Sequence, residues 1–273
     1  MKLGKKVYNK KLVWGAAIVI VMLLISVVGP VIYRINPNTI DPVQRLSSIH
    51  SEGHLLGTDH LGRDMLARIL YGTKLSVLSS FATAFAAIVF GVAIGLFAGM
   101  SKKWVDIVVM RIMDLMQAFP SILLCVLIVA ILGPNLRNAM IAIAIVNIPF
   151  FAVLTRSVTL SEKEKEYVRA SRAIGNSEFY TAVVHILPNI STYLISQSMM
   201  TVGWMLTSLT SLSFLGLGVQ PPEAELGSML GELRTVMILK PSIVAIPGIV
   251  IIIIVIGINL FGDGLKEQLD PKN

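Results

Sequence analysis

The sequence contains few charged residues: Asp, Glu, Lys and Arg together make up 14% of its 273 residues, whereas soluble domains carry about 25%. Apolar residues account for 55%, and the mean hydropathy is +0.77. This composition excludes an ordinary soluble domain. Because one spanning helix needs about 20 mostly apolar residues, the chain is long enough for several crossings, and we expect an all-α polytopic membrane protein.

The sequence also lacks the motifs of common catalytic sites. It contains no G-x-x-x-x-G-K-[ST] phosphate-binding loop, no G-x-S-x-G nucleophile turn and no H-E-x-x-H zinc helix. Its one cysteine, Cys125, permits no internal disulfide. We therefore expect no catalytic residues and no cofactor bound by this chain.

A short polar stretch contains residue types that suggest a metal site. As ligands, His54, Asp59, His60 and Asp64 suit nickel or zinc. Their spacing does not match a defined site, and they do not form a closed ligand set. Loop capping and solvation are the preferred interpretation, and we expect no metal.

Long apolar runs predict six membrane crossings, at about residues 12–33, 75–100, 106–132, 138–155, 190–217 and 242–262. A lysine-rich start precedes the first run and resembles that of a signal peptide. As a helix, however, this run is about 33 Å long, which exceeds what a signal peptide needs. We expect an uncleaved membrane anchor.

Lysine and arginine are distributed unequally between the two sides that six crossings create. With the N-terminus inside, fourteen of the 23 basic residues lie inside, eight lie outside, and Arg111 lies within a crossing. The positive-inside rule then predicts that both termini are cytoplasmic. The same rule accounts for the net charge of +7 without a nucleic-acid partner.

These crossings divide the chain into three parts. Residues 1–11 form a cytoplasmic N-terminal tail, residues 12–74 the first transmembrane helix and an extracytoplasmic segment, and residues 75–273 a five-helix core. Within the second part, apolar residues at helical spacing predict a short helix lying on the outer surface: Met65, Leu66, Ile69 and Leu70. Residues 218–241 predict a re-entrant or surface-lying piece.

A charged segment at about residues 161–189 separates two apolar runs on the inner side. Ser161 and Glu164 match a capping box, and Gly175 suits a helix end, so a helix–turn–helix is expected. Glu166, Ala170 and Ala173 fall on one helix face. This face suits contact with a soluble partner, but an ordinary solvated loop explains the residues equally well.

The same segment resembles the loop signature of ATP-binding-cassette (ABC) importer permeases. The run EYVRASRAIG is followed, thirteen residues after its glycine, by the proline of a Leu-Pro pair. The chain departs from the signature at Arg169, where Glu is usual, at Ser171, where Ala is usual, and at His185, where Ile is usual. The resemblance implies a coupling helix that docks in a groove of an ATPase subunit, through Glu166, Arg169, Ala170, Ser171, Ala173, Gly175, Leu187 and Pro188.

Four further blocks resemble the C-type permeases of the dipeptide, oligopeptide and nickel family. They are LGTDHLGRD at 56–64, RIMD at 111–114 with AFP at 118–120, SFLGLGVQPP at 213–222 and NLFGDGLKEQLDP at 259–271. Leu226-Gly227 replaces the usual Trp-Gly pair. The resemblance implies a type I importer fold in a prokaryotic plasma membrane and a cargo of peptides or nickel and metal-chelate complexes. The implied partners are a B-type permease, two ATPase subunits that use ATP and Mg, and an extracytoplasmic binding protein.

Polar and ionisable residues within the apolar runs are candidates for the pathway or its gate. Arg111 and Asp114 are spaced to form an i, i+3 pair that neutralises itself. A pathway role and a simple structural pair are both open. Side chains that either line the path or pack between helices are Asn147, Met200, Thr201 and Trp204.

Gly91, Gly95 and Gly99 form a stripe of small residues in the second run. Such a stripe lets two membrane helices approach closely. A helix that slides during gating is one interpretation, and static packing within the subunit is the one we favour.

Two rival functions differ in what they require. A secondary transporter driven by an ion gradient works without an ATPase and needs more ionisable residues at mid-membrane. A membrane-embedded metalloenzyme needs clustered His, Asp or Glu, which the His54–Asp64 stretch offers only weakly. Transport measured with and without ATPase subunits separates these functions from an ABC importer.

Overall fold

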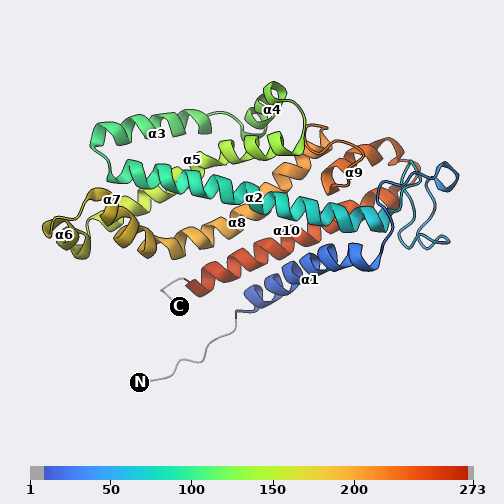
Figure 1. Cartoon of the computed structure of the whole chain (residues 1–273), viewed down its shortest axis with the longest axis horizontal. Coiled ribbons are helices and arrows are strands. Elements are labelled where there is room, and N and C mark those ends of the chain that lie inside the picture. Colours follow the sequence, from blue (N-terminus) through green and yellow to red (C-terminus); the bar gives the residue numbers. More distant parts are fainter. Residues whose placement is uncertain (1–8, 270–273) are drawn as a thin grey trace, which may run out of the picture.

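The computed structural model describes residues 9–269, and within this range the chain folds into helices joined by loops (Figure 1). The expected tail at residues 1–11 lies mostly outside the described residues. The long helices are α1 (Lys10–Ile32), α2 (Met65–Met100), α3 (Lys103–Gln117), α4 (Ser121–Leu132), α5 (Leu136–Lys163), α8 (Leu187–Phe214) and α10 (Pro241–Leu269). The short ones are α6 (Glu166–Ala173), α7 (Glu178–Tyr180) and α9 (Leu226–Leu233), with a π-helix at Thr181–Ile186 and 3₁₀ turns at Pro42–Gln44 and Arg234–Val236.

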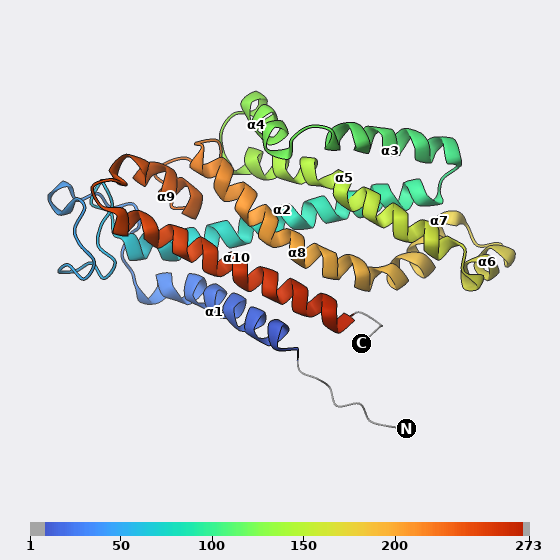
Figure 2. The ribbon, with the colours of Figure 1, turned by 180° about the vertical axis from the view of Figure 1, so that it is seen from behind.

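The helices α1, α2, α5, α8 and α10 run along the long axis of the molecule (Figures 1 and 2). One end of this bundle carries α6 and α7, and the other carries α9 and the loop at residues 33–64. We name them the α6 end and the α9 end. Helix α1 lies beside α10 in both views, and a methyl group at Gly15 or Gly264 would overlap the backbone of the other helix.

Four of the described helices, α1, α2, α5 and α10, are long and apolar enough to cross a membrane. The third expected crossing, at 106–132, is not one straight helix, because α3 and α4 meet at 91°. Pro120 explains the break, since it lacks an N–H and restricts the backbone of the preceding residue. If the bent pair of α3 and α4 is one broken crossing, the described helices offer five crossings. Helix α8 has 28 residues but is richer in Ser and Thr.

The expected surface helix at residues 65–70 is wrong. These residues are the first turns of α2, and Met65, Ile69 and Leu70 are buried. Asp64 caps α2 by accepting a hydrogen bond from the backbone N–H of Ala67 at 2.7 Å. The apolar spacing identified a helix correctly, but its burial against other helices, not against a membrane surface, explains the spacing. The expected boundary between residues 74 and 75 falls inside α2.

The glycine stripe of α2 lies against α5. A methyl group at Gly95 would overlap the carbonyl oxygen of Ala152, and one at Gly99 would lie 2.8 Å from Thr159 Cγ2. At Gly91 it would meet Phe151. The two helix backbones therefore approach as closely as small residues allow.

Candidate functional site

The α6 end is built around a sharp turn between α5 and α6. Helix α5 continues through Ser161 to Lys163, so the expected helix start at Ser161 is wrong, and α6 begins at Glu166 instead. The carboxylate of Glu162 accepts hydrogen bonds from Tyr167 Oη at 2.5 Å and Lys165 Nζ at 2.9 Å. Burial, together with the bond to Glu162, raises the pKa of Tyr167 to about 12. These bonds fix the direction in which α6 leaves α5.

Helix α6 has one exposed face and one buried face. The exposed side chains recur at helical spacing and are Glu166, Arg169, Ala170 and Ala173. Val168 and Ser171 point inward and are buried. The structure therefore brings four of the signature residues onto one open surface, whereas Ser171 lies behind it.

Ser171 organises the inside of the turn. Its hydroxyl lies 3.1 Å from that of Thr181 and accepts a hydrogen bond from Asn176 Nδ2 at 3.1 Å. Gly175 adopts φ +91°, a left-handed conformation that glycine tolerates at a helix end. Arg172 on α6 pairs with Glu178 on α7 at 2.9 Å. Together these contacts hold α6 and α7 at a fixed angle.

Two large apolar side chains project from this turn and were missed by the motif comparison. Ile174 is 79% exposed and Phe179 is 78% exposed. Large exposed apolar side chains on a charged segment are typical of a protein interface. In the sequence, Ile174 and Phe179 flank Gly175, and a position at such a turn predicts that both side chains are exposed.

After α7 the chain stays helical into α8, with a π-helix at Thr181–Ile186. The N–H of Leu187 bonds the carbonyl of Ala182, five residues earlier. Pro188, which has no N–H, is exposed in the first turn of α8. Leu187 is half-buried and packs with the cluster that contains Val168. The α6–α7 segment, residues 164–186, is thus joined to α5 and α8 without a flexible linker.

A cavity of about 260 Å³ lies between α4, α5 and α8. Of the expected pathway residues, Asn147 and Trp204 line it, but Met200 and Thr201 do not. Met200 packs against α10 near Gly262, and Thr201 bonds the carbonyl of Gln197 on its own helix. We name this space the α4–α5–α8 cavity.

Three hydroxyl side chains of α8 lie on the wall of this largely apolar cavity. With Trp204, the residues Thr207, Ser208 and Ser211 occupy one helix face and line the cavity. Each hydroxyl donates to a carbonyl four residues earlier on α8, at 2.7–3.0 Å. Their oxygens remain available as acceptors. The i, i+3, i+4, i+7 spacing of these residues identifies this face in the sequence, and our sequence analysis missed it.

The expected pair of Arg111 and Asp114 does not form. Both residues are exposed on α3, and the structure records no ion pair between them within residues 9–269. The acid that anchors α3 is Asp106, whose Oδ2 lies 2.5 Å from Arg156 Nη2 on α5. Residue spacing permits an i, i+3 pair, but packing turns Asp106 toward α5 and leaves Arg111 exposed.

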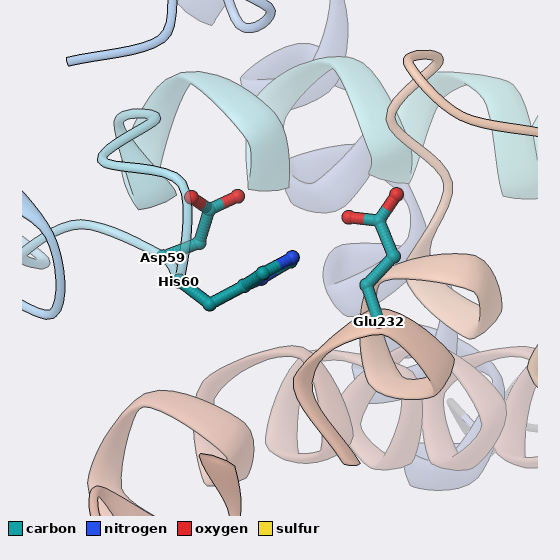
Figure 3. Close-up of side chains that lie close together, drawn as sticks. All are labelled: Asp59, His60 and Glu232. Atoms are coloured by element: carbon teal, nitrogen blue, oxygen red, sulfur yellow. The ribbon is translucent and has the colours of Figure 1, made fainter. Parts of the chain in front are cut away.

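At the α9 end, Asp59, His60 and Glu232 offer ligand atoms that all lie within 4.8 Å of one another (Figure 3). Arginine groups already occupy these carboxylates. Asp59 Oδ2 lies 2.6 Å from Arg63 Nε, and Glu232 Oε2 pairs with Arg63 and Arg68. A cation would have to displace two guanidinium groups, so the residues do not fit a metal site.

The remaining candidate metal ligands form a separate group. Asp64 Oδ2 accepts a hydrogen bond from Tyr33 Oη at 3.0 Å and lies 2.6 Å from His54 Nδ1. Asp64 is also the N-cap of α2. Its carboxylate therefore ties the end of α1 and the 33–64 loop to the start of α2, as loop capping predicts.

Comparison with known proteins identifies relatives that are all permease proteins of transport systems. Residues 91–273 match the family described as binding-protein-dependent transport system inner membrane component. The dipeptide transport system permease protein DppC of Alkalihalophilus pseudofirmus is 42% identical over 97% of this chain and 86% of its own. The glutathione transport system permease protein GsiD of Pectobacterium atrosepticum is 40% identical over 84% of this chain and 76% of its own.

A solved structure shares the fold. A chain of the MetNI methionine ABC transporter, solved in inward-facing conformations, superposes with a TM-score of 0.61 and 18% identity. The match covers 76% of this chain and 98% of that chain. Together with the sequence relatives, it means that this chain belongs to the binding-protein-dependent transport system inner membrane components and is a multi-pass permease subunit of an ABC importer.

Proposed function

We propose that this chain forms part of the translocation pathway for peptides and that its α6–α7 segment receives the movement of an ATPase subunit. The observation that carries the proposal is the open surface of this segment. Glu166, Arg169, Ala170, Ile174 and Phe179 are exposed, and the turn beneath them is held by hydrogen bonds and buried packing. A segment that is held in this way and has exposed side chains transmits a push to the helices behind it.

The partners follow from the family. We propose a B-type permease that completes the pathway, two ATPase subunits that bind ATP and Mg, and an extracytoplasmic binding protein. In this arrangement the α6 end is cytoplasmic, α8 is the sixth crossing, and both termini are cytoplasmic. Rigid-body movement of the helices then alternates access between the two sides.

Peptides are the proposed cargo because the relatives named above transport dipeptides and glutathione, as their names state. The α4–α5–α8 cavity supports this class. Its hydroxyl oxygens are hydrogen-bond acceptors, and a peptide presents N–H and ammonium donors. We propose peptides over the nickel or metal-chelate complexes that the sequence motifs also suggested.

Crosslinking tests the ATPase contact. We expect a cysteine at the exposed Ala170 to crosslink to the ATPase subunit in the assembled transporter. A cysteine at Val43, which is 93% exposed in the 33–64 loop, is the matched control and should not crosslink. The native Cys125 is buried, and the chain that carries only this cysteine measures the background level of crosslinking. The proposal fails if Ala170→Cys and Val43→Cys behave alike.

Transport measurements test the energy source. In vesicles that contain both permeases, we expect dipeptide uptake to require the ATPase subunits, ATP and the binding protein. An ion-gradient transporter would continue to take up dipeptide without the ATPase. Uptake under that condition would contradict the proposed function.

A further inference from the structure

Helix α9 is attached to α2 at its first turn through a buried acid. Glu225 is fully buried and caps α9 by accepting a hydrogen bond from the N–H of Ser228 at 2.8 Å. Its other oxygen accepts a hydrogen bond from Ser76 Oγ on α2 at 2.7 Å, and the N–H of Leu226 donates to the same hydroxyl at 3.2 Å. Burial raises the pKa of Glu225. A buried acid without these partners would be strongly unfavourable.

The last turn of α9 is attached to α2 through an ion-pair network. Glu232 Oε2 lies 3.2 Å from Arg68 Nη2, and Arg68 belongs to α2. Arg63 pairs with the same carboxylate and with Asp59, and both arginines are buried. Loss of one partner from such a network leaves an uncompensated buried charge. Helix α9 is therefore held to α2 at both of its ends.

Helix α9 also sets the position of the last turns of α8. A methyl group at Gly227 would overlap the backbone of Thr210, and one at Gly231 would lie 2.8 Å from the carbonyl oxygen of Phe214. Ser211, which lines the α4–α5–α8 cavity, lies between these two contacts on α8. A displacement of α9 must therefore move the cavity wall at this end.

The opposite end of α2 reaches the α6–α7 segment. Leu96 of α2 packs in one buried cluster with Val168 of α6 and Ile186 of the π-helix. At the end of α5, directly before this segment, Lys163 Nζ donates a hydrogen bond to the carbonyl of Gly99 on α2 at 3.2 Å. Helix α2 is one unbroken helix of 36 residues, about 54 Å long, without a proline. It thus extends from the α9 end to the α6 end, where it packs against α5, the helix that leads into α6.

We propose that α2 carries the movement of the α6–α7 segment to α9, and that Glu225 and Glu232 are positioning residues that make α9 follow α2. This inference rests on the proposed function, since it needs an ATPase to move the α6–α7 segment. When α9 is displaced, the last turns of α8, which pack against it, move with it. In this way hydrolysis at one face of the membrane changes the cavity wall near the other face.

Variants of Glu225 in the reconstituted transporter test the inference. We expect Glu225→Ala to lower peptide uptake about tenfold while ATP hydrolysis stimulated by the binding protein stays within about twofold of the wild type. Glu225→Gln keeps an acceptor for Ser228 and should retain most uptake. Glu223→Gln, an exposed acid two residues earlier, is the matched control. A merely structural role would lower uptake and hydrolysis together, and that result would overturn the inference.

A disulfide gives a second test in an otherwise native chain. A side chain at Gly72 on α2 would make ordinary contact, 3.4 Å, with the backbone N of Leu226. We expect the oxidised pair Gly72→Cys and Leu226→Cys to retain uptake, because α2 and α9 move together. Uptake that is lost on oxidation and restored by a reductant would mean that the two helices move apart, and would overturn the inference.

The ATPase contact is checked in the same samples. The crosslink from Ala170→Cys should persist in the Glu225 variants, because the α6–α7 segment is unchanged. If that crosslink is already absent in the wild-type background, the proposed function fails. If it forms while Glu225→Ala leaves uptake unchanged, the proposed function stands and the role of α2 and α9 is wrong.

Discussion

The hydroxyl groups of Ser171 and Thr181 lie 3.1 Å apart in the buried angle between α6 and the helix that follows it. Ser171 stands where the importer signature that this segment resembles has an alanine, and an alanine could not make this polar contact. Both residues are buried. The open surface of the α6–α7 segment depends on this internal contact, because the exposed residues gain their positions from the turn behind them.

Removal of the Ser171 hydroxyl should loosen the turn. Ser171→Ala leaves the Thr181 hydroxyl and Asn176 without a buried partner, at a cost of about 1–2 kcal/mol. We expect ATPase affinity of the assembled permease pair to fall about five- to tenfold. Ser161→Ala, at an exposed position on α5, is the control. Equal affinity for both variants would contradict this role of Ser171.

Truncation of the two exposed apolar side chains should weaken ATPase binding most. Ile174→Ala and Phe179→Ala each remove an anchor of the open surface, and interface anchors contribute about 2 kcal/mol or more. We expect about a 30-fold loss of affinity for Phe179→Ala. Glu164→Gln breaks only an exposed pair with Arg169 and should change affinity by less than about twofold. A quantitative pull-down ranks the three variants, and an equal effect of all three would argue against apolar anchoring.

The buried acid of α9 should make stability depend on pH. Burial raises the pKa of Glu225 above the usual 4.5, so the folded chain holds this proton to a higher pH than the unfolded chain does. The stability contributed by the protonated acid is complete below pH 4.5 and is lost as the pH rises through the raised pKa. The melting temperature of the wild type should therefore fall relative to that of Glu225→Gln between pH 4.5 and neutrality. A constant difference over this range would contradict the assignment.

Tight packing between α2 and α5 should make the glycine stripe intolerant of larger residues. Gly95→Ala places a methyl group against the carbonyl oxygen of Ala152, and overpacking of this kind costs about 1–3 kcal/mol. Gly248→Ala, on α10, meets no atom within 4 Å and should be tolerated. Melting temperatures of the purified chain measure both. A Gly95→Ala variant as stable as Gly248→Ala would mean that the two helices are more loosely packed than the structure indicates.

The sequence predicted those features that depend on periodicity and composition. The all-α membrane architecture is confirmed, and the period of α6 placed Glu166, Ala170 and Ala173 on one face. Gly175 ends that helix region with a positive φ, as its lack of a side chain suggests. The importer family could be predicted because its motifs are short continuous stretches of sequence. The relatives confirm it.

Features that depend on which surfaces meet were not predictable in this way. Spacing allowed Arg111 to pair with Asp114, but the structure pairs Asp106 with Arg156, 50 residues away. Ser171 belonged to the signature, yet packing turns it inward. The contact between Glu225 and Ser76 joins residues 149 positions apart, and spacing within one helix carries no information about such partners.

One crosslink tests the central claim most directly. A cysteine at Ala173, an exposed residue of α6 whose replacement leaves both apolar anchors in place, is introduced in the assembled transporter and treated with a short thiol-to-amine crosslinker. We expect a covalent product with the ATPase subunit whose yield changes when ATP is hydrolysed. Absence of that product, with labelling of the cysteine from the side that the binding protein occupies, would contradict the account.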